Sequence, residues 1–244
     1  MCDATVAPAC TKAGPLKIFF KAISIKRKSF AADHHFYNMK HLFLPLLVCL
    51  IYLGAGAQSD NKIVIGKVDS VFSKTLNEQR KIWVYVPDML NGNTDTNRRY
   101  PVVYLLDGDG HFESVVGMIQ QLSSINGNTN CPEMIVVGIP NTDRTRDLTP
   151  THIASDPPMM DSGFSKNTGG GENFVAFIEK ELMPHIDSAY PTQPYKVLIG
   201  HSFGGLTVMN VITNHTTLFN AYIAIDPSMW YDQQRFLKAT EAKL

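Results

Sequence analysis

The sequence predicts an α/β fold, in which a mostly parallel, twisted sheet carries helices on both faces. Four short segments are apolar throughout rather than alternating, which is typical of parallel strands covered on both sides; they are residues 101–106, 134–139, 195–199 and 221–225. Helical patterns separate them, as in doubly wound proteins. The chain of 244 residues, 44% hydrophobic and 18% charged, also has the length and composition of one large globular domain.

Residues 39–57, the first segment with a clear pattern, have the three parts of a secretory signal. A basic start at Lys40 precedes an apolar run over residues 42–53, and an Ala-Gly-Ala sequence ends at Ala57. The apolar run is shorter than the roughly 20 residues that span a bilayer. We therefore expect cleavage after Ala57, export to the periplasm or the exterior, and no stable membrane anchor in the processed protein.

Two other interpretations of this segment are weaker. A buried N-terminal helix would be interrupted by Pro45 and would lack a polar face, and a lipoprotein signal at Cys49 would need a small residue where Val48 stands. Residues 1–38 show no periodicity, so we expect an unstructured upstream extension there, with Met39 as the natural start. Residues 58–244 then form the α/β domain.

The elements of this domain follow in a simple order. Residues 63–72 and 81–86 are β-branched and aromatic and predict an antiparallel pair of strands, followed by a loop over residues 91–95. The helical patterns lie between and after the apolar strands, at residues 112–122, 172–186, 206–212 and 229–243. Residues 141–171 are rich in Thr, Asp, Pro and Gly without periodicity, which predicts a long loop of the kind that is usually functional or mobile.

The charge balance and the cysteines exclude several classes of protein. Lysine plus arginine number 22 and aspartate plus glutamate 22, so there is no basic excess for a nucleic-acid partner. The four cysteines form no CxxC pair, which argues against a zinc site and against a disulfide framework. We therefore expect neither a metal nor another cofactor.

The strongest chemical signal is the segment Gly200-His201-Ser202-Phe203-Gly204. It follows an apolar strand directly and precedes a helical pattern directly, which is the context that a nucleophile elbow requires. The two glycines leave room for a strained turn at the serine. Ser202 would then stand at a helix N-terminus, where free N–H groups favour developing negative charge. The alternative is a glycine-rich turn in which Ser202 only caps the helix.

A second loop, at residues 107–112 (DGDGHF), follows another strand and opens a helix. The second oxyanion donor of a serine hydrolase comes from this position. Asp107, Asp109 and His111 might instead suggest a metal loop, but the calcium pattern fails at its later positions. The run of glycines at residues 169–171 is not a phosphate-binding loop, because no Gly-Lys-Ser/Thr follows.

Four segments in this order, YLLDGDGHF, VVGIPNTDRTRDLTPTH, NFVAFIEKELMPHID and LIGHSFGGL, carry a resemblance to a known family. Over residues 62–232 the chain resembles the putative-esterase branch of the α/β-hydrolase superfamily, which includes esterase-D-like enzymes, enterochelin esterases, feruloyl esterases and mycolyltransferases. The resemblance implies Ser202 as the nucleophile and the backbone amides of Phe203 and Asp109 as the oxyanion hole. It also implies a pocket for a small-molecule ester, shaped by residues 141–171. Residues 226–230 (DPSMW) look like the family's Ser-Pro-Ser-x-Trp stretch, and we expect them beside the pocket.

The sequence departs from the family pattern after the serine. The family's acid and histidine follow two further strands, whereas here 42 residues follow Ser202. His215 would lie roughly 20 Å along the helix from Ser202, too far for a base. His111 and Asp226 are the remaining candidates for the base and the acid. We expect a truncated sequence, in which the last strands, the acid and the histidine lie beyond Leu244.

The function expected from the sequence is hydrolysis of carboxylic esters through an acyl-Ser202 intermediate. Two alternatives stay open: acyl transfer to an alcohol within the same fold, and a non-catalytic binding module that keeps only the pocket. Four aromatic residues could line that pocket or belong to the core, namely Phe112, Phe164, Trp230 and Tyr231.

Overall fold

The computed structural model describes residues 63–87 and 97–243. They belong to one of the two compact units into which the chain divides, Asn61–Leu244. The predicted extension (1–38), the predicted signal sequence (39–57) and the predicted loop at 91–95 lie outside the described residues. No helix within the described residues has both the length and the hydropathy needed to cross a bilayer.

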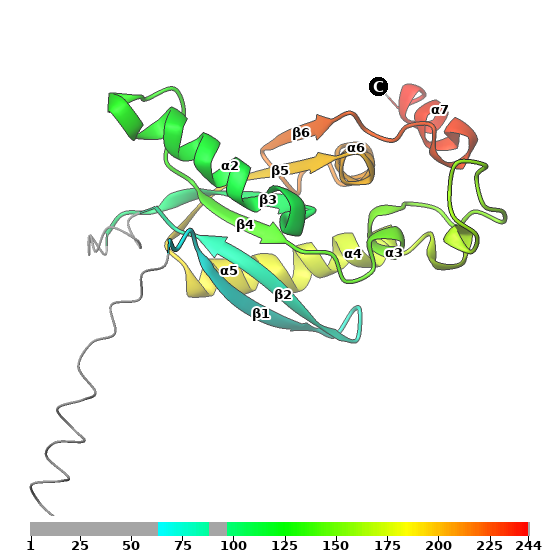
Figure 1. The fold of residues 1–244 in the computed structure, drawn as a ribbon, viewed down its shortest axis with the longest axis horizontal. Coiled ribbons are helices and arrows are strands. Elements are labelled where there is room, and N and C mark those ends of the chain that lie inside the picture. The colour runs from blue at the N-terminus through cyan, green and yellow to red at the C-terminus, as the bar shows by residue number, and fades with distance from the viewer. Residues whose placement is uncertain (1–62, 88–96, 244) are drawn as a thin grey trace, which may run out of the picture. The chain divides into compact units, whose positions relative to one another are not determined.

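Six strands form one sheet in the order β1-β2-β4-β3-β5-β6 (Figure 1). The strands are β1 (Lys67–Ser73), β2 (Glu78–Tyr85), β3 (Tyr100–Leu106), β4 (Ile135–Ile139), β5 (Thr192–His201) and β6 (Ala221–Ile225). The first two pair antiparallel and β2 joins β4 antiparallel, while the pairs β3–β4, β3–β5 and β5–β6 are parallel. The predicted mostly parallel sheet and the antiparallel pair before it are confirmed.

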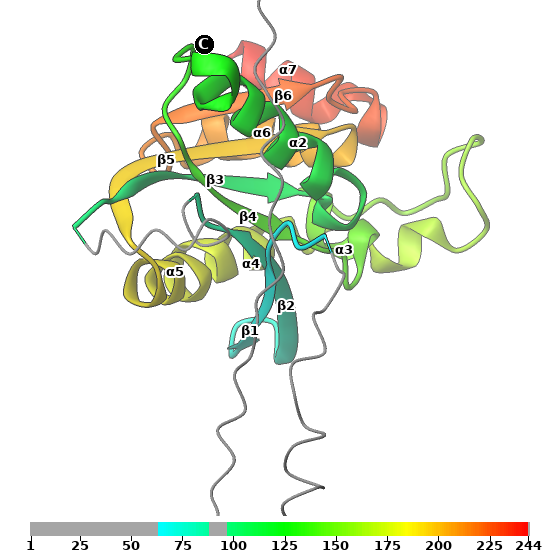
Figure 2. The same ribbon diagram turned by 60° about the vertical axis from the view of Figure 1, so that its left-hand side comes forward.

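Helices cover both faces of the sheet (Figure 2). On one face, α2 (Gly108–Ser123) packs Phe112, Val116 and Ile119 against alternate residues of β3, β4 and β5. The other face carries α4 (Gly171–Phe177), α5 (Met183–Ala189) and α6 (Phe203–Asn214) over the larger core cluster. Because strands buried on both sides have no polar face, this double cover explains the apolar runs of β3 and β4, whereas Ile223 and Ile225 of β6 remain exposed.

The predicted helix at 172–186 is one continuous helical segment with a wide turn in its middle. A π-helical stretch, Ile178–Leu182, joins α4 to α5. Pro184 stands in the first turn of α5 and has no N–H to donate to the preceding turn, which favours such a bulge.

Two predictions of local structure were wrong. The helix expected over 229–243 begins only with α7 (Arg235–Glu241), because Asp232, Gln233 and Gln234 all have positive φ angles of 49°, 53° and 62°. The long stretch 141–171 is not without structure: it contains α3 (Arg144–Leu148) and a 3₁₀ helix, Phe164–Asn167. The first deviation has a tertiary cause, since Thr151 donates to Asp232 and accepts a hydrogen bond from Tyr231. α3 has a local one, because Asp143 caps it by accepting a hydrogen bond from Arg146 N at 3.0 Å.

Candidate active site

Ser202 stands on a strained turn between β5 and α6, with φ 57° and ψ −115°. Its backbone is held from both sides, because its N–H donates to Ile225 O at 3.0 Å and its carbonyl accepts from Leu206 N and Ser228 N at 2.9 and 3.1 Å. A side chain at position 200 would not fit, since a Cβ on Gly200 would lie 2.3 Å from the carbonyl oxygen of Gly204. This is the conformation expected for a nucleophile elbow.

The Ser202 hydroxyl is half-buried and has one hydrogen-bond partner within residues 63–87 and 97–243. That partner is Ser228, whose Oγ lies 3.2 Å from Ser202 Oγ and whose residue is 5% exposed. Ser228 belongs to the DPSMW segment, which the structure thus places beside the elbow. The sequence reasoning expected this segment near the pocket but did not single out Ser228.

The two amides proposed from the resemblance as oxyanion donors begin two helices at the same edge of the sheet. Phe203 is the first residue of α6, and Asp109 lies in the first turn of α2. Neither N–H donates a hydrogen bond to another group in the described part of the chain. The two turns touch, because a Cβ on Gly204 would lie 3.1 Å from Asp107 Oδ2. The amides are therefore free to bind an oxygen atom with negative charge.

The loop before α2 is fixed by two side chains that the sequence reasoning missed. Asp107 is buried in the left-handed conformation (φ 52°, ψ 44°) and accepts two hydrogen bonds from Arg144, Nε to Oδ1 at 2.6 Å and Nη2 to Oδ2 at 3.0 Å. Asn141 Nδ2 bridges Asp107 Oδ1 and Asp109 Oδ1 at 2.8 and 3.0 Å. The two carboxylates thus bind an arginine and an amide. Among the described residues there is no group of three or more His, Cys, Asp or Glu placed to hold a metal ion.

In the structure, neither His111 nor Asp226 is paired with Ser202 as a base or an acid would be. The His111 ring on α2 packs edge-on against the His201 ring, with the centroids 5.7 Å apart. Asp226 is exposed just after β6, and neither residue forms a hydrogen bond with the other or with Ser202. His215 ends α6 and its Nε2 lies 2.9 Å from Glu172 Oε2, away from the elbow. In the described part of the chain, no histidine forms a hydrogen bond with the Ser202 hydroxyl.

Three of the four aromatic residues noted in the sequence surround the Phe203 side chain, which is 5% exposed. The rings of Phe164, Trp230 and Tyr231 have centroids 5.8, 5.7 and 5.9 Å from that of Phe203. Phe164 comes from the 141–171 stretch, which therefore does approach the elbow. A cavity of about 560 Å³ adjoins this cluster at Trp230 and is lined by residues 152–159 together with Asp232, Gln233 and Arg235.

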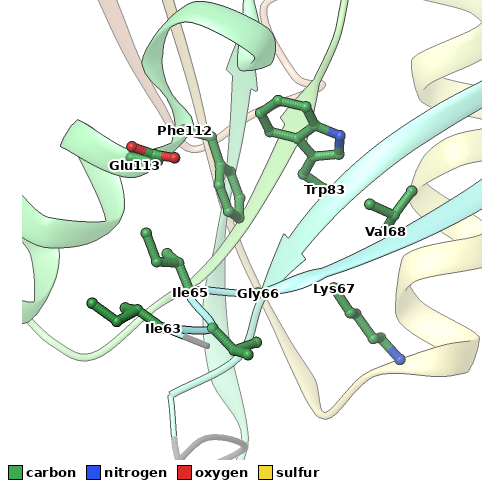
Figure 3. Close-up of a pocket in the computed structure, with 9 residues that line it drawn as sticks. Ile63, Ile65, Gly66, Lys67, Val68, Trp83, Phe112 and Glu113 are labelled. Atoms are coloured by element: carbon green, nitrogen blue, oxygen red, sulfur yellow. The ribbon is translucent and has the colours of Figure 1, made fainter. Parts of the chain in front are cut away.

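Phe112, the fourth aromatic residue, lies elsewhere. Its ring packs edge-on against Trp83 at 5.7 Å, and the two rings face a shallow apolar hollow at the start of β1 (Figure 3). Residues 63–68 form the other side of that hollow. Phe112 is thus part of the packing of α2 on the sheet, and it does not join the aromatic cluster around Phe203.

Comparisons with known proteins identify a family for this chain. A family model described as "Putative esterase" matches residues 73–242. The ferri-bacillibactin esterase BesA of Bacillus subtilis is 32% identical over 151 residues, which cover 58% of this chain and 52% of that protein. A siderophore enterobactin esterase of Emericella nidulans is 30% identical over 152 residues, 58% of this chain and 50% of that one.

Among solved structures, an IroE-like serine hydrolase from Shewanella oneidensis matches with a TM-score of 0.67 and 38% identity, over 73% of this chain and 55% of that one. The chain spans about half the length of the curated relatives that it matches, as the shares of 52% and 50% show.

Proposed function

The chain belongs to the putative-esterase family, and on that premise we propose that it hydrolyses carboxylic esters through an acyl intermediate on Ser202. One observation carries the proposal: a strained serine between β5 and α6 lies beside two helix N-termini whose first amides are free. A serine that only capped α6 would accept a hydrogen bond from the helix, and the Ser202 side chain makes no such bond.

The chemistry follows from this placement. Ser202 Oγ attacks the ester carbonyl carbon, its proton passes to a general base, and the carbonyl oxygen becomes an oxyanion that the amides of Phe203 and Asp109 bind. Collapse breaks the bond to the alcohol, which leaves with a proton. Water then attacks the acyl-serine in the same way and releases the acid. In hydrolases of this type the acid and the histidine follow the serine in the chain, and we assign the base to no described residue.

We propose a siderophore ester as the substrate class. The relatives are named for ferri-bacillibactin and for enterobactin. The cavity of about 560 Å³ beside Trp230 supports this, since ligand pockets of 300–1,000 Å³ are usual and Trp230 offers an aromatic wall. His152 and Arg235 supply polar groups at its rim.

Labelling and hydrolysis test the proposal together. We expect a fluorophosphonate probe to modify the wild-type protein at Ser202, and p-nitrophenyl acetate and enterobactin to be hydrolysed by the wild type and not by Ser202→Ala. Unchanged hydrolysis by Ser202→Ala would refute the assignment of the nucleophile. Enterobactin binding without labelling or turnover would identify a binding module instead. Ester products that appear only when an alcohol is added would identify acyl transfer.

We also propose that the protein is exported through residues 39–57, with cleavage after Ala57. N-terminal sequencing of the protein recovered outside the cytoplasm should begin at Gln58. A product that keeps its signal segment and stays in the cytoplasm would refute this.

A further inference from the structure

We infer that Arg144 is a positioning residue, which holds the two halves of the oxyanion hole in place. The inference rests on the proposed function, because it concerns the locations of the Asp109 and Phe203 amides. Arg144 lies on α3, in the stretch between β4 and α4, and its side chain touches both halves.

The contact with the first half is a bidentate ion pair. Arg144 Nε and Nη2 bind the two carboxylate oxygens of Asp107 at 2.6 and 3.0 Å, a geometry that only the planar guanidinium provides. Asp107 adopts the left-handed conformation that a non-glycine residue rarely takes. It stands two residues before Asp109, so its conformation sets the direction of the chain that carries the Asp109 amide. Its carbonyl also accepts from Gly110 N at 2.9 Å. The carboxylate contact therefore fixes the residue from which the donor loop starts.

The contact with the second half is a cation–π interaction. The Arg144 guanidinium lies over the Phe203 ring, 5.3 Å from its centroid, and Phe203 carries the other oxyanion amide. The other ring contacts of Phe203 are with aromatic side chains, so the guanidinium is its charged partner. One side chain thus links the α2 turn to the α6 turn.

Arg144 is itself anchored by a buried network. On the same helix, Asp147 binds Arg80 of β2 at 2.6 Å, and both side chains are 1% exposed. Arg146 pairs with Asp147 at 2.7 Å and with Glu78 at 2.6 Å. The fully buried Arg80–Asp147 pair ties α3 to β2 and fixes the base from which Arg144 extends, and this pair remains when the more exposed Arg146 side chain is removed. A side chain that is held at both ends can maintain the distance between two catalytic amides.

Three variants separate positioning from general stability. Arg144→Ala removes both contacts, Arg144→Lys keeps the charge without the bidentate geometry, and Arg146→Ala is the matched control. Arg146 is on the same helix, its side chain is 30% exposed against 38% for Arg144, and it touches neither Asp107 nor Phe203. The measurements are kcat and KM on p-nitrophenyl acetate, thermal unfolding, and hydrogen exchange of the peptide covering residues 106–112.

We expect Arg144→Ala to lower kcat by about 100-fold while KM changes by less than about threefold, because a misplaced catalytic group costs about this much. Arg144→Lys should be similarly slow. Guanidinium added in solution should restore part of the rate of Arg144→Ala and nothing in Arg144→Lys. Arg146→Ala should unfold at a lower temperature and keep kcat. Exchange of the 106–112 peptide should rise in Arg144→Ala and stay unchanged in Arg146→Ala.

A wild-type kcat in folded Arg144→Ala would overturn the inference, and so would an equal loss of kcat in Arg146→Ala. Failure of the proposed function has a different signature, namely that Ser202→Ala leaves hydrolysis unchanged or that the wild type has none. In that case hydrogen exchange still decides: unaltered exchange of the 106–112 peptide in Arg144→Ala overturns the inference, and faster exchange supports it.

Discussion

At the scale of single residues, Ser228 is the hydrogen-bond partner of the proposed nucleophile among the described residues. Its hydroxyl lies 3.2 Å from Ser202 Oγ and binds no other group among the described residues. We expect Ser228→Ala to lower kcat about fivefold, because a neutral hydrogen bond contributes roughly 1 kcal/mol and Ser202 would lose orientation rather than reactivity. The rate of fluorophosphonate labelling should fall by the same factor.

Ser188→Ala is the matched control for this prediction, since Ser188 is exposed and bonds only the His185 carbonyl. It should leave kcat and the labelling rate unchanged. A loss in Ser228→Ala as large as that in Ser202→Ala would contradict an orienting role and would make Ser228 part of the reaction itself.

The residues of the site differ in how far the sequence could predict them. Ser202 was found because its motif is local: strand, glycine, serine and helix follow one another within ten residues. Arg144 and Asn141 were missed because their partners lie in another loop, and only the pairing of β3 with β4 brings the two loops together. The polar residues directly after β4 could have indicated their role, because the parallel strands β3 and β4 end at the same edge of the sheet.

At the scale of elements, the buried pair Arg80–Asp147 fastens α3 to β2. Both side chains are 1% exposed, and the Arg80 guanidinium also lies over the rings of Phe174 and Phe177. We expect Asp147→Asn to lower the free energy of unfolding by about 3 kcal/mol, because it leaves the buried Arg80 guanidinium with only the partly exposed Glu78 as a countercharge. Chemical denaturation measures this.

The exposed pair Arg235–Asp232, 3.8 Å apart with Arg235 76% exposed, gives the control. Arg235→Ala should change the unfolding free energy by less than about 1 kcal/mol. If the two variants were equally stable, the buried network would not be what holds α3 in place.

Glu78 makes the same network sensitive to acid. Hydrogen bonds from Arg146, and more weakly from Arg80, lower the pKa of Glu78 to about 2, against the cost of burial. A carboxyl with a lowered pKa stabilises the fold above its unfolded pKa of about 4.5. This contribution is lost as the pH falls from about 4.5 towards 2. We expect chemical denaturation to show a steep loss of stability in this window.

Glu78→Gln isolates this effect. The variant should be less stable than the wild type at pH 7, and its stability should depend less on pH between about 4.5 and 2. Parallel pH profiles for the two proteins would mean that other carboxylates cause the acid sensitivity.

Elements with a strong periodic pattern were predictable, and those decided by tertiary contacts were not. The helix predicted from the α6 pattern is confirmed, because most of this helix, from Phe203 to Val211, is buried in the core. By contrast, α3 has five residues, which is too short for a period to appear. The sequence of residues 232–234 favours a helix. The hydrogen bonds that Tyr231 and Asp232 form with Thr151 instead keep these residues at positive φ angles.

At the scale of the whole molecule, the two edges of the described sheet differ. The β1 edge also exposes apolar side chains, Val68 at 67% and Phe72 at 56%, but it is guarded by the polar residues Lys67, Asp69 and Ser70 that stand between them, which discourage pairing with another strand. The β6 edge presents Ile223 and Ile225, which are 46% and 49% exposed. An apolar hollow of about 290 Å³ adjoins Ile225 and is lined by residues of α2 and β5. Unpaired backbone groups beside apolar side chains are a template for association.

We therefore expect residues 58–244 to self-associate through β6 as the concentration rises, and Ile223→Lys to suppress this. A lysine there places a charge on the edge without touching the elbow, because the Ser202 amide bonds Ile225 and not Ile223. Light scattering over a concentration series measures the effect, and fluorophosphonate labelling of Ser202 should be unchanged. Val68→Lys, at an exposed position of the guarded edge, should leave the association as it is. Equal association of Ile223→Lys and the wild type would show that the contact lies on another surface.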